Sequence, residues 1–270
     1  GNLNYIRDTT LDSELEETGR VIDREQRERY GGEAGIGFQI DQLSNIALDY
    51  TYTDTIYQSD QRVNRNVNRV ALPYSRSFND YLDTWSISPS YAQANTDNDI
   101  TIDYYNLTLG WLHDFNDTLA MRNYVGYGYT LTKEDKETTP YNTWNANLSL
   151  IKNGEIFRFA LGYRGYITLD SQGNLLEVDR LYFRLRKWLT ERLGFLFYAS
   201  TYASRPVEVF DQIDSWYYDL KPELRYQLTE NHSLNLFYRF SSEEDRTGSS
   251  SDYRTRNVIE LRFDFNFPDQ

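Results

Sequence analysis

The chain contains no cysteine, and this absence excludes several kinds of structure at once. Without thiols there is no disulfide framework, no cysteine-ligated cluster and no covalently attached c-type haem within these 270 residues. Histidine is almost as scarce, since only His113 and His232 are present. We therefore expect no metal site and no cofactor in this chain.

Long apolar segments are missing too. No run of 18 apolar residues occurs, so no transmembrane helix is expected. The sequence starts at Gly1 without the basic segment and apolar run of a signal peptide, so we expect a mature form or a sequence that lacks one. The formal net charge of -13 disfavours nucleic acid as a partner.

Aromatic residues, by contrast, are abundant. They make up 16% of the chain and include 24 tyrosines, although the mean hydropathy is only -0.72. A water-soluble protein with so many aromatics would normally carry more Leu, Ile and Val in its core. A membrane β-barrel reconciles the two facts, because its outside is apolar with aromatic girdles and its inside is polar.

Short turns recur at intervals of 36 to 39 residues. They are Asp41–Ser44, Ser77–Asp80, Asp114–Asp117, Lys152–Glu155, Thr190–Leu193 and Thr229–His232. Six turns and two chain ends at one rim make seven hairpins, which corresponds to fourteen strands. This repeat predicts an all-β fold: a single domain (residues 1–270) forming a transmembrane antiparallel up-and-down β-barrel of the bacterial outer membrane.

Alternation of apolar and polar residues supports the strands and is clearest near the end of the chain. Ile259, Leu261, Phe263, Phe265 and Phe267 share one face, opposite Glu260, Arg262, Asp264 and Asn266. A period of two predicts a strand and not a helix. The aromatic end resembles the C-terminal strand of outer-membrane proteins, where it signals barrel assembly, although Pro268-Asp269-Gln270 follow it here.

The charged face should be the lumen, because one Arg near the bilayer midplane on the lipid face costs roughly 2–4 kcal/mol. A soluble sandwich with its apolar face inward is the alternative. The strand count also has an alternative. The segments Leu3–Glu14 and Arg62–Tyr74 alternate poorly, and a barrel without them would have twelve strands.

Inward positions of the C-terminal half are mostly basic. The predicted lumen-lining, substrate-contacting residues are Arg158, Arg164, Arg180, Tyr182, Arg184, Arg186, Lys221, Arg225, Arg239 and Arg262. They outnumber the inward acids Asp219, Glu223, Glu260 and Asp264. Guanidinium groups bind carboxylate and phosphate bidentately, which predicts a track that attracts anions. Alternatively, these residues pair with the lumen acids as a structural ladder. The N-terminal half should contribute small polar groups such as Thr84, Ser88 and Thr108.

Acidic residues gather in the longer connections, at Glu14–Glu28, Lys133–Glu137, Glu208–Asp214 and Glu243–Asp252. They predict a solvated extracellular rim, or one that shares divalent cations with lipopolysaccharide phosphates. No enzyme is expected. The two histidines lie at predicted periplasmic turns, and Asp219 and Glu223 are four residues apart, about 13 Å along a strand.

Turn-and-strand units such as Trp188–Phe195 and Tyr226–Leu236 resemble bacterial outer-membrane β-barrel porins, specifically the porin 2-like group associated with exopolysaccharide loci. The architecture is also similar to that of monomeric fourteen-stranded porins. The resemblance implies a channel for saccharides or other hydrophilic solutes in contact with lipid and lipopolysaccharide, alongside a periplasmic export partner. Two alternatives are a sheath barrel around a secretion or electron-conduit partner, and a structural or adhesive surface barrel.

Overall fold

The structure is a computed structural model that describes residues 1–9, 26–59, 61–80, 82–134, 137–207, 215–246 and 252–265. These residues form fifteen strands and no helix. The strands are β1 (Asn2–Thr9), β2 (Gln26–Gln39), β3 (Ser44–Tyr57), β4 (Arg65–Ala71), β5 (Tyr74–Phe78), β6 (Asp83–Thr96), β7 (Thr101–Asn116), β8 (Leu119–Glu134), β9 (Glu137–Asn153), β10 (Phe157–Leu169), β11 (Leu175–Trp188), β12 (Leu193–Pro206), β13 (Ser215–Thr229), β14 (His232–Asp245) and β15 (Asp252–Phe265).

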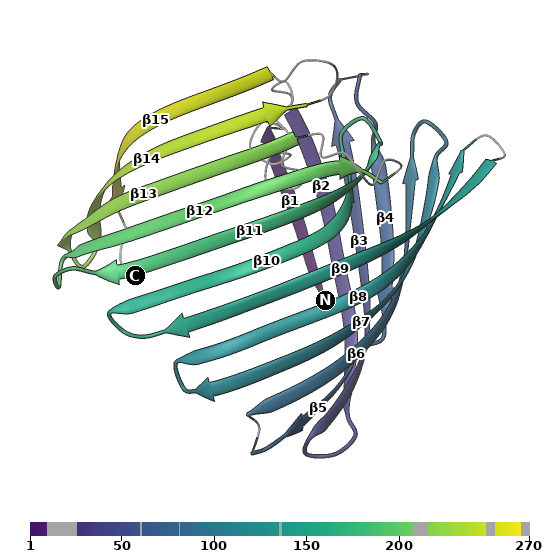
Figure 1. Cartoon of the computed structure of the whole chain (residues 1–270), viewed down its shortest axis with the longest axis horizontal. Coiled ribbons are helices and arrows are strands. Elements are labelled where there is room, and N and C mark those ends of the chain that lie inside the picture. Colours follow the sequence, from purple (N-terminus) through teal and green to yellow (C-terminus); the bar gives the residue numbers. More distant parts are fainter. Residues whose placement is uncertain are drawn as a thin grey trace.

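All ladders are antiparallel, and strands that are adjacent in the sequence pair with each other except for β4 and β5. The sheet curls around a central space (Figure 1). The order runs from β1 to β15, and no ladder joins these two ends within the described residues. Among those residues, no helix is long and apolar enough to cross a membrane. The predicted all-β, up-and-down antiparallel architecture is confirmed.

The strands β4 and β5 occupy one position in the sheet, because both pair with β3 and with β6. They are separated at Leu72 and Pro73, where proline has no N–H to donate to a ladder. The sheet stays continuous there, since the Ala47 N–H donates to the Pro73 carbonyl at 2.9 Å and the Leu72 N–H to the Pro89 carbonyl at 3.0 Å. The fifteen strands thus fill fourteen positions. Each weak segment contributes a strand, since β1 covers the described part of Leu3–Glu14 and β4 lies within Arg62–Tyr74. The twelve-strand alternative is therefore wrong.

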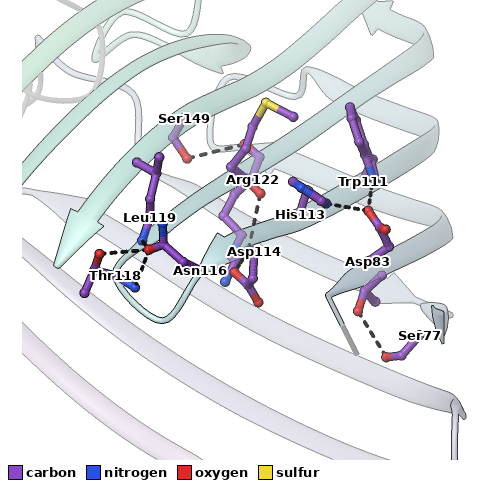
Figure 2. A network of polar contacts seen from close by, with 12 residues as sticks. Ser77, Asp83, Trp111, His113, Asp114, Asn116, Thr118, Leu119, Arg122 and Ser149 are labelled. Atoms are coloured by element: carbon purple, nitrogen blue, oxygen red, sulfur yellow. Dashed lines mark hydrogen bonds and ion pairs between the residues drawn. The ribbon is translucent and has the colours of Figure 1, made fainter. Parts of the chain in front are cut away.

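All six predicted turns connect strands at the same rim (Figure 1). Short turns face the periplasm in outer-membrane barrels, so we call this the periplasmic rim and the other the outer rim. Side chains fix the turns: the Asp41 carboxylate accepts the Leu43 N–H at 2.8 Å, which lowers the pKa of Asp41 below its ordinary value. In the turn after β7, Asn116 Oδ1 accepts the N–H groups of Thr118 and Leu119, at 3.0 and 2.9 Å (Figure 2).

The outer surface of the sheet is apolar and uncovered. Leu109, Leu161, Leu236 and Ile259 are 55%, 45%, 46% and 75% exposed, and they lie on the face opposite the arginines. A soluble sandwich would bury such side chains under a second layer. The sandwich alternative is therefore wrong, and the exposed apolar face is the lipid-facing surface of a barrel.

A ring of tyrosines marks the membrane boundary that is nearer the outer rim. Each of five outward tyrosines donates its hydroxyl to an Asn or Asp on the next strand. The pairs are Tyr50–Asn68 at 2.7 Å, Tyr91–Asp103 at 2.7 Å, Tyr127–Asn142 at 2.6 Å, Tyr163–Asp179 and Tyr238–Asn257 at 2.5 Å. Tyrosine suits an interface because its ring is apolar and its hydroxyl is polar.

A second aromatic girdle lies near the periplasmic rim. The rings of Trp85 and Trp111 stack at 5.8 Å, and Asp83 accepts hydrogen bonds from Trp111 Nε1 at 3.0 Å and His113 Nδ1 at 2.7 Å (Figure 2). On β7, Tyr105 and Phe115 are ten residues apart, which is roughly 33 Å along a strand. At a strand tilt of about 40° this spans roughly 25 Å, the height of the apolar band of an outer-membrane barrel.

The acidic connections are only partly within the described residues. Glu208–Asp214 lies outside them, as do most of Glu14–Glu28 and the middle of Glu243–Asp252. Lys133 belongs to β8 and pairs with Asp103 at 2.6 Å, outside the barrel. Glu243 is 5% exposed and lies within β14, so its assignment to a solvated rim is wrong.

An added charge should destabilise the protein more on the lipid-facing side of the sheet than on the lumen side. We predict that Leu109→Arg lowers the free energy of unfolding by about 2–4 kcal/mol, because Leu109 faces lipid between the girdles. The matched control is Ser88→Arg on the inward face of β6, opposite Thr108, which should cost under about 1 kcal/mol. Urea unfolding in lipid vesicles measures both, and equal losses would contradict the assigned faces.

Candidate functional site: an arginine-lined cavity in the lumen

A cavity of about 740 Å³ lies in the lumen between the N-terminal and C-terminal walls. Its lining comes from strands β2 to β4 on one side and β6 to β11 around the rest. Five lining residues are charged, and all five are arginines: Arg29, Arg65, Arg69, Arg164 and Arg180. Within the described part of the chain, no Asp, Glu or Lys lines this cavity. Its charge is therefore of one sign.

Strand register places these arginines on the inward face. On β10 and β11, Arg164 lies directly opposite Arg180, and Arg158 directly opposite Arg186. Like charges at directly opposed positions destabilise a sheet. On β4, Arg65 and Arg69 share a face with Val67, and Arg69 lies opposite Thr51 of β3 and Ala92 of β6. This arrangement concentrates positive charge that an anion would neutralise.

Arg180 is the most constrained of the five. Its guanidinium donates to the Tyr198 hydroxyl and lies 4.8 Å from the ring centroid of Tyr202 and 5.8 Å from that of Tyr182. The Nε atom is buried and has no hydrogen-bond partner among the described residues. Arg69 and Arg164 make neither an ion pair nor a hydrogen bond within the same residues. The cavity thus offers guanidinium donors to a solute.

Neutral polar groups complete the wall. Asn145 Nδ2 donates to Asn106 Oδ1 at 2.6 Å, reaching from β9 over β8 to β7. This reach requires glycine on β8, since a Cβ at Gly126 would lie 2.4 Å from Asn145 Oδ1. Rings of Tyr104, Tyr124 and Tyr166 also line the cavity. Amides can hydrogen-bond the hydroxyls of a sugar, and aromatic rings can stack on its faces.

The ten predicted lumen residues divide into groups. Arg164 and Arg180 line the cavity. Tyr182 lies over Gly162, where a Cβ would approach its ring to 2.4 Å, and the guanidinium of Arg184 lies 5.5 Å from the ring centroids of both Tyr182 and Tyr198. Arg158 and Arg186 lie nearer the periplasmic rim, where Arg158 Nε donates to the Gly154 carbonyl at 3.1 Å and Arg186 lies 5.2 Å from the Trp188 ring.

The strands β13 to β15 hold the remaining basic residues, and carboxylates neutralise most of them. Asp219, with its side chain 6% exposed, contacts Arg239 Nε at 3.0 Å and Lys221 Nζ at 2.8 Å. Arg262 pairs with Asp264 at 2.9 Å. Arg225 is inward, opposite Asn235, and its buried Nε has no partner among the described residues. The structural-ladder interpretation therefore describes β13 to β15, whereas β10 and β11 carry like-charged pairs.

Sequence reasoning missed the arginines of the N-terminal wall. It assigned small polar groups to that wall, and Asn106 and Thr108 do line the cavity, but Arg29, Arg65 and Arg69 were not assigned a face. The signal was present in Arg62–Tyr74, because Arg65, Val67, Arg69 and Ala71 alternate with Asn66, Asn68, Val70 and Leu72. An inward valine between two arginines hid the pattern, since neither face is uniformly apolar.

Comparison with known proteins supports the fold. No protein-family model and no curated protein matches the sequence. Among solved structures, the alcaligin outer membrane receptor FauA from Bordetella pertussis superposes over 91% of this chain at 12% identity, with a TM-score of 0.52. The chain spans about half of that receptor, 52% of its length. The NanC and KdgM porins match over 98% of both chains, at 13% and 9% identity, with TM-scores of only 0.28 and 0.27.

The likeness to FauA and the lipid-facing surface together define the class. The chain has the fold of a bacterial outer-membrane β-barrel, and the outer membrane is its location. The low TM-scores of the two porin matches add nothing to this assignment.

The Asp219 carboxylate, which pairs with both Arg239 and Lys221 in the lumen, should be important for stability. We predict that Asp219→Asn lowers the free energy of unfolding by about 3 kcal/mol, because it leaves Arg239 and Lys221 without their buried counter-charge. Asp264→Asn is the control, since the more exposed Arg262–Asp264 pair should contribute under about 1 kcal/mol. Denaturant unfolding in lipid measures both, and equal losses would argue against the ladder.

Proposed function

We propose that this protein is an outer-membrane channel that passes hydrophilic solutes and prefers anions, with acidic saccharides as the favoured cargo. The observation that carries the proposal is the lumen cavity, whose described charged lining consists of arginines alone. The proposal is also supported by Arg164 and Arg180, which lie directly opposite each other on adjacent strands. A bound anion would relieve the repulsion between them. We propose that the solute contacts all ten predicted lumen residues, and that the residues of β10 and β11 contribute most to its binding.

A saccharide is favoured over a simple ion by the neutral part of the lining. The asparagine amides and tyrosine rings of the cavity match sugar hydroxyls and sugar faces, respectively. A volume of about 740 Å³ lies within the range of small-molecule sites. A sheath around a protein partner would need a wider lumen, and we do not propose it. No catalytic role is proposed.

Membership of the porin 2-like, exopolysaccharide-associated group is part of the proposal, as are contacts with lipopolysaccharide and with a periplasmic export partner. The turn-and-strand units at Trp188–Phe195 and Tyr226–Leu236 support it. We also propose that residues 1–270 act as one barrel domain.

Ion selectivity tests the proposal directly. In planar bilayers under a salt gradient, we expect the wild-type protein to be anion-selective and to be blocked by an acidic disaccharide more strongly than by a neutral one. Arg69→Gln combined with Arg164→Gln should shift the reversal potential towards cations. It should also weaken block by the acidic disaccharide at least tenfold, because charge-assisted hydrogen bonds contribute about 1.5–3 kcal/mol each.

Arg76→Gln is the matched control, because Arg76 of β5 lies opposite Trp85 on the lipid-facing side, away from the cavity. It removes one positive charge outside the lumen and should leave selectivity and block unchanged. A non-selective wild-type pore, or equal effects of Arg76→Gln and of the double substitution, would contradict an anion-preferring lumen.

A further inference from the structure

Two segments that are far apart in the sheet meet inside the lumen at its outer end. One is residues 62–65, where the connection after β3 enters β4. The other is residues 169–173, where β10 ends and the turn to β11 begins. Four strands, β6 to β9, separate β4 from β10 along the sheet, so these segments make no ladder with each other (Figure 1). We call the pair of segments the latch.

Polar contacts hold the latch together. The Val63 N–H donates to the Ser171 carbonyl at 2.9 Å, and Arg62 Nη1 donates to Ser171 Oγ at 3.0 Å. Arg65 Nη1 donates to the carbonyls of Leu169 and Asp170, the latter at 3.1 Å. These atoms are shielded from solvent, since Asp170 and Ser171 are at most 1% exposed and Arg62 and Arg65 are 9% exposed.

Apolar contacts cross the lumen at the same level. Leu169 packs with Ala94 of β6 and Ile102 of β7, and all three are at most 4% exposed. Val67, Tyr104 and Leu175 pack against this cluster. Inward positions of a water-filled barrel are normally polar. An apolar cluster between opposing walls therefore indicates a closed passage at this level.

The β10–β11 turn is built as a rigid unit. Asp170 Oδ1 accepts the N–H groups of Gln172 at 2.9 Å and Asn174 at 2.8 Å. Gly173 has φ of +86°, a conformation that favours glycine. A Cβ at Gly173 would lie 3.7 Å from Val63 Cβ, so the tip of the turn rests on the opposite segment. Such a turn can leave its contacts as one piece.

We propose that the latch is the outer gate of the arginine-lined cavity, closed in this structure and opened when the β10–β11 turn separates from residues 62–65. Arg65 and Leu169 of the latch line the cavity, as do Val67 and Ala94 of the apolar cluster beside it. The closed passage therefore forms the outer end of the cavity. The proposal rests on the proposed channel function, because a gate has meaning only in a conducting pore.

A reversible disulfide tests the gate. Val63→Cys with Gly173→Cys places two Cβ atoms 3.7 Å apart, within the range of natural disulfides, and the chain has no other cysteine. We expect the oxidised variant to conduct at least tenfold less than the same protein after reduction. Val63→Ser with Gly173→Ser is the matched control. It carries the same backbone strain at residue 173 without a cross-link, and it should not respond to reductant.

The outcomes of this experiment distinguish failure of the gate from failure of the channel. Equal conductance of the oxidised and reduced forms, with the cross-link shown by mass spectrometry, overturns the gate and leaves the channel standing. Failure of the cross-link to form in a folded barrel also overturns the gate, because the segments then do not touch. Absence of conductance in every folded form, wild type and serine control included, overturns the channel and the gate with it.

A labelling experiment covers the case in which the Gly173 variants do not fold. Ala92→Cys places a single thiol on the cavity wall. With a membrane-impermeant thiol reagent added outside intact cells, we expect slow labelling, accelerated at least fivefold when Arg62→Gln and Ser171→Ala weaken the latch. An unchanged labelling rate overturns the gate independently of any conductance.

Discussion

A sheet placed in hydrocarbon must satisfy its backbone hydrogen bonds internally and show the lipid only apolar side chains. Most other features of this protein depend on that constraint. Because side chains alternate across a strand, an apolar outer face places every second residue in the lumen, and between the two aromatic girdles the charged residues lie there. The same constraint explains the two aromatic girdles, whose tyrosine hydroxyls and Trp111 Nε1 find partners on neighbouring strands at the membrane boundaries.

Inside the barrel, charge is distributed unevenly. On β13 to β15 the cations have carboxylate partners, with Asp219 between Arg239 and Lys221. On β10 and β11, Arg164 lies directly opposite Arg180, and two further arginines on β4 line the same cavity. Like charges at directly opposed positions destabilise a sheet, so the opposed Arg164 and Arg180 fit a binding site better than a purely structural ladder. The latch lies at the outer end of this site and separates it from the exterior.

The fold was largely predictable because period-two alternation and evenly spaced turns are local properties of the sequence. Fourteen strands were expected, and both weak segments contribute a strand, with Pro73 marking a break inside one of them. The site was predictable only in part. Arg164 and Arg180 were assigned to the lumen, but Arg65 and Arg69 were not, because Val67 between them obscured the face. The latch was not foreseeable, since Ser171 and Val63 are 108 residues apart and no periodicity relates them.

The central claim is that anions gather in the lumen cavity between β4 and the β10–β11 pair. Anomalous diffraction from crystals of the wild-type protein grown in bromide measures this directly. The account predicts a bromide peak inside the cavity, within contact distance of Arg69, Arg164 or Arg180, that is lost in crystals of the Arg69→Gln, Arg164→Gln protein. Bromide found only at the surface or rims, with none in the cavity, would contradict it.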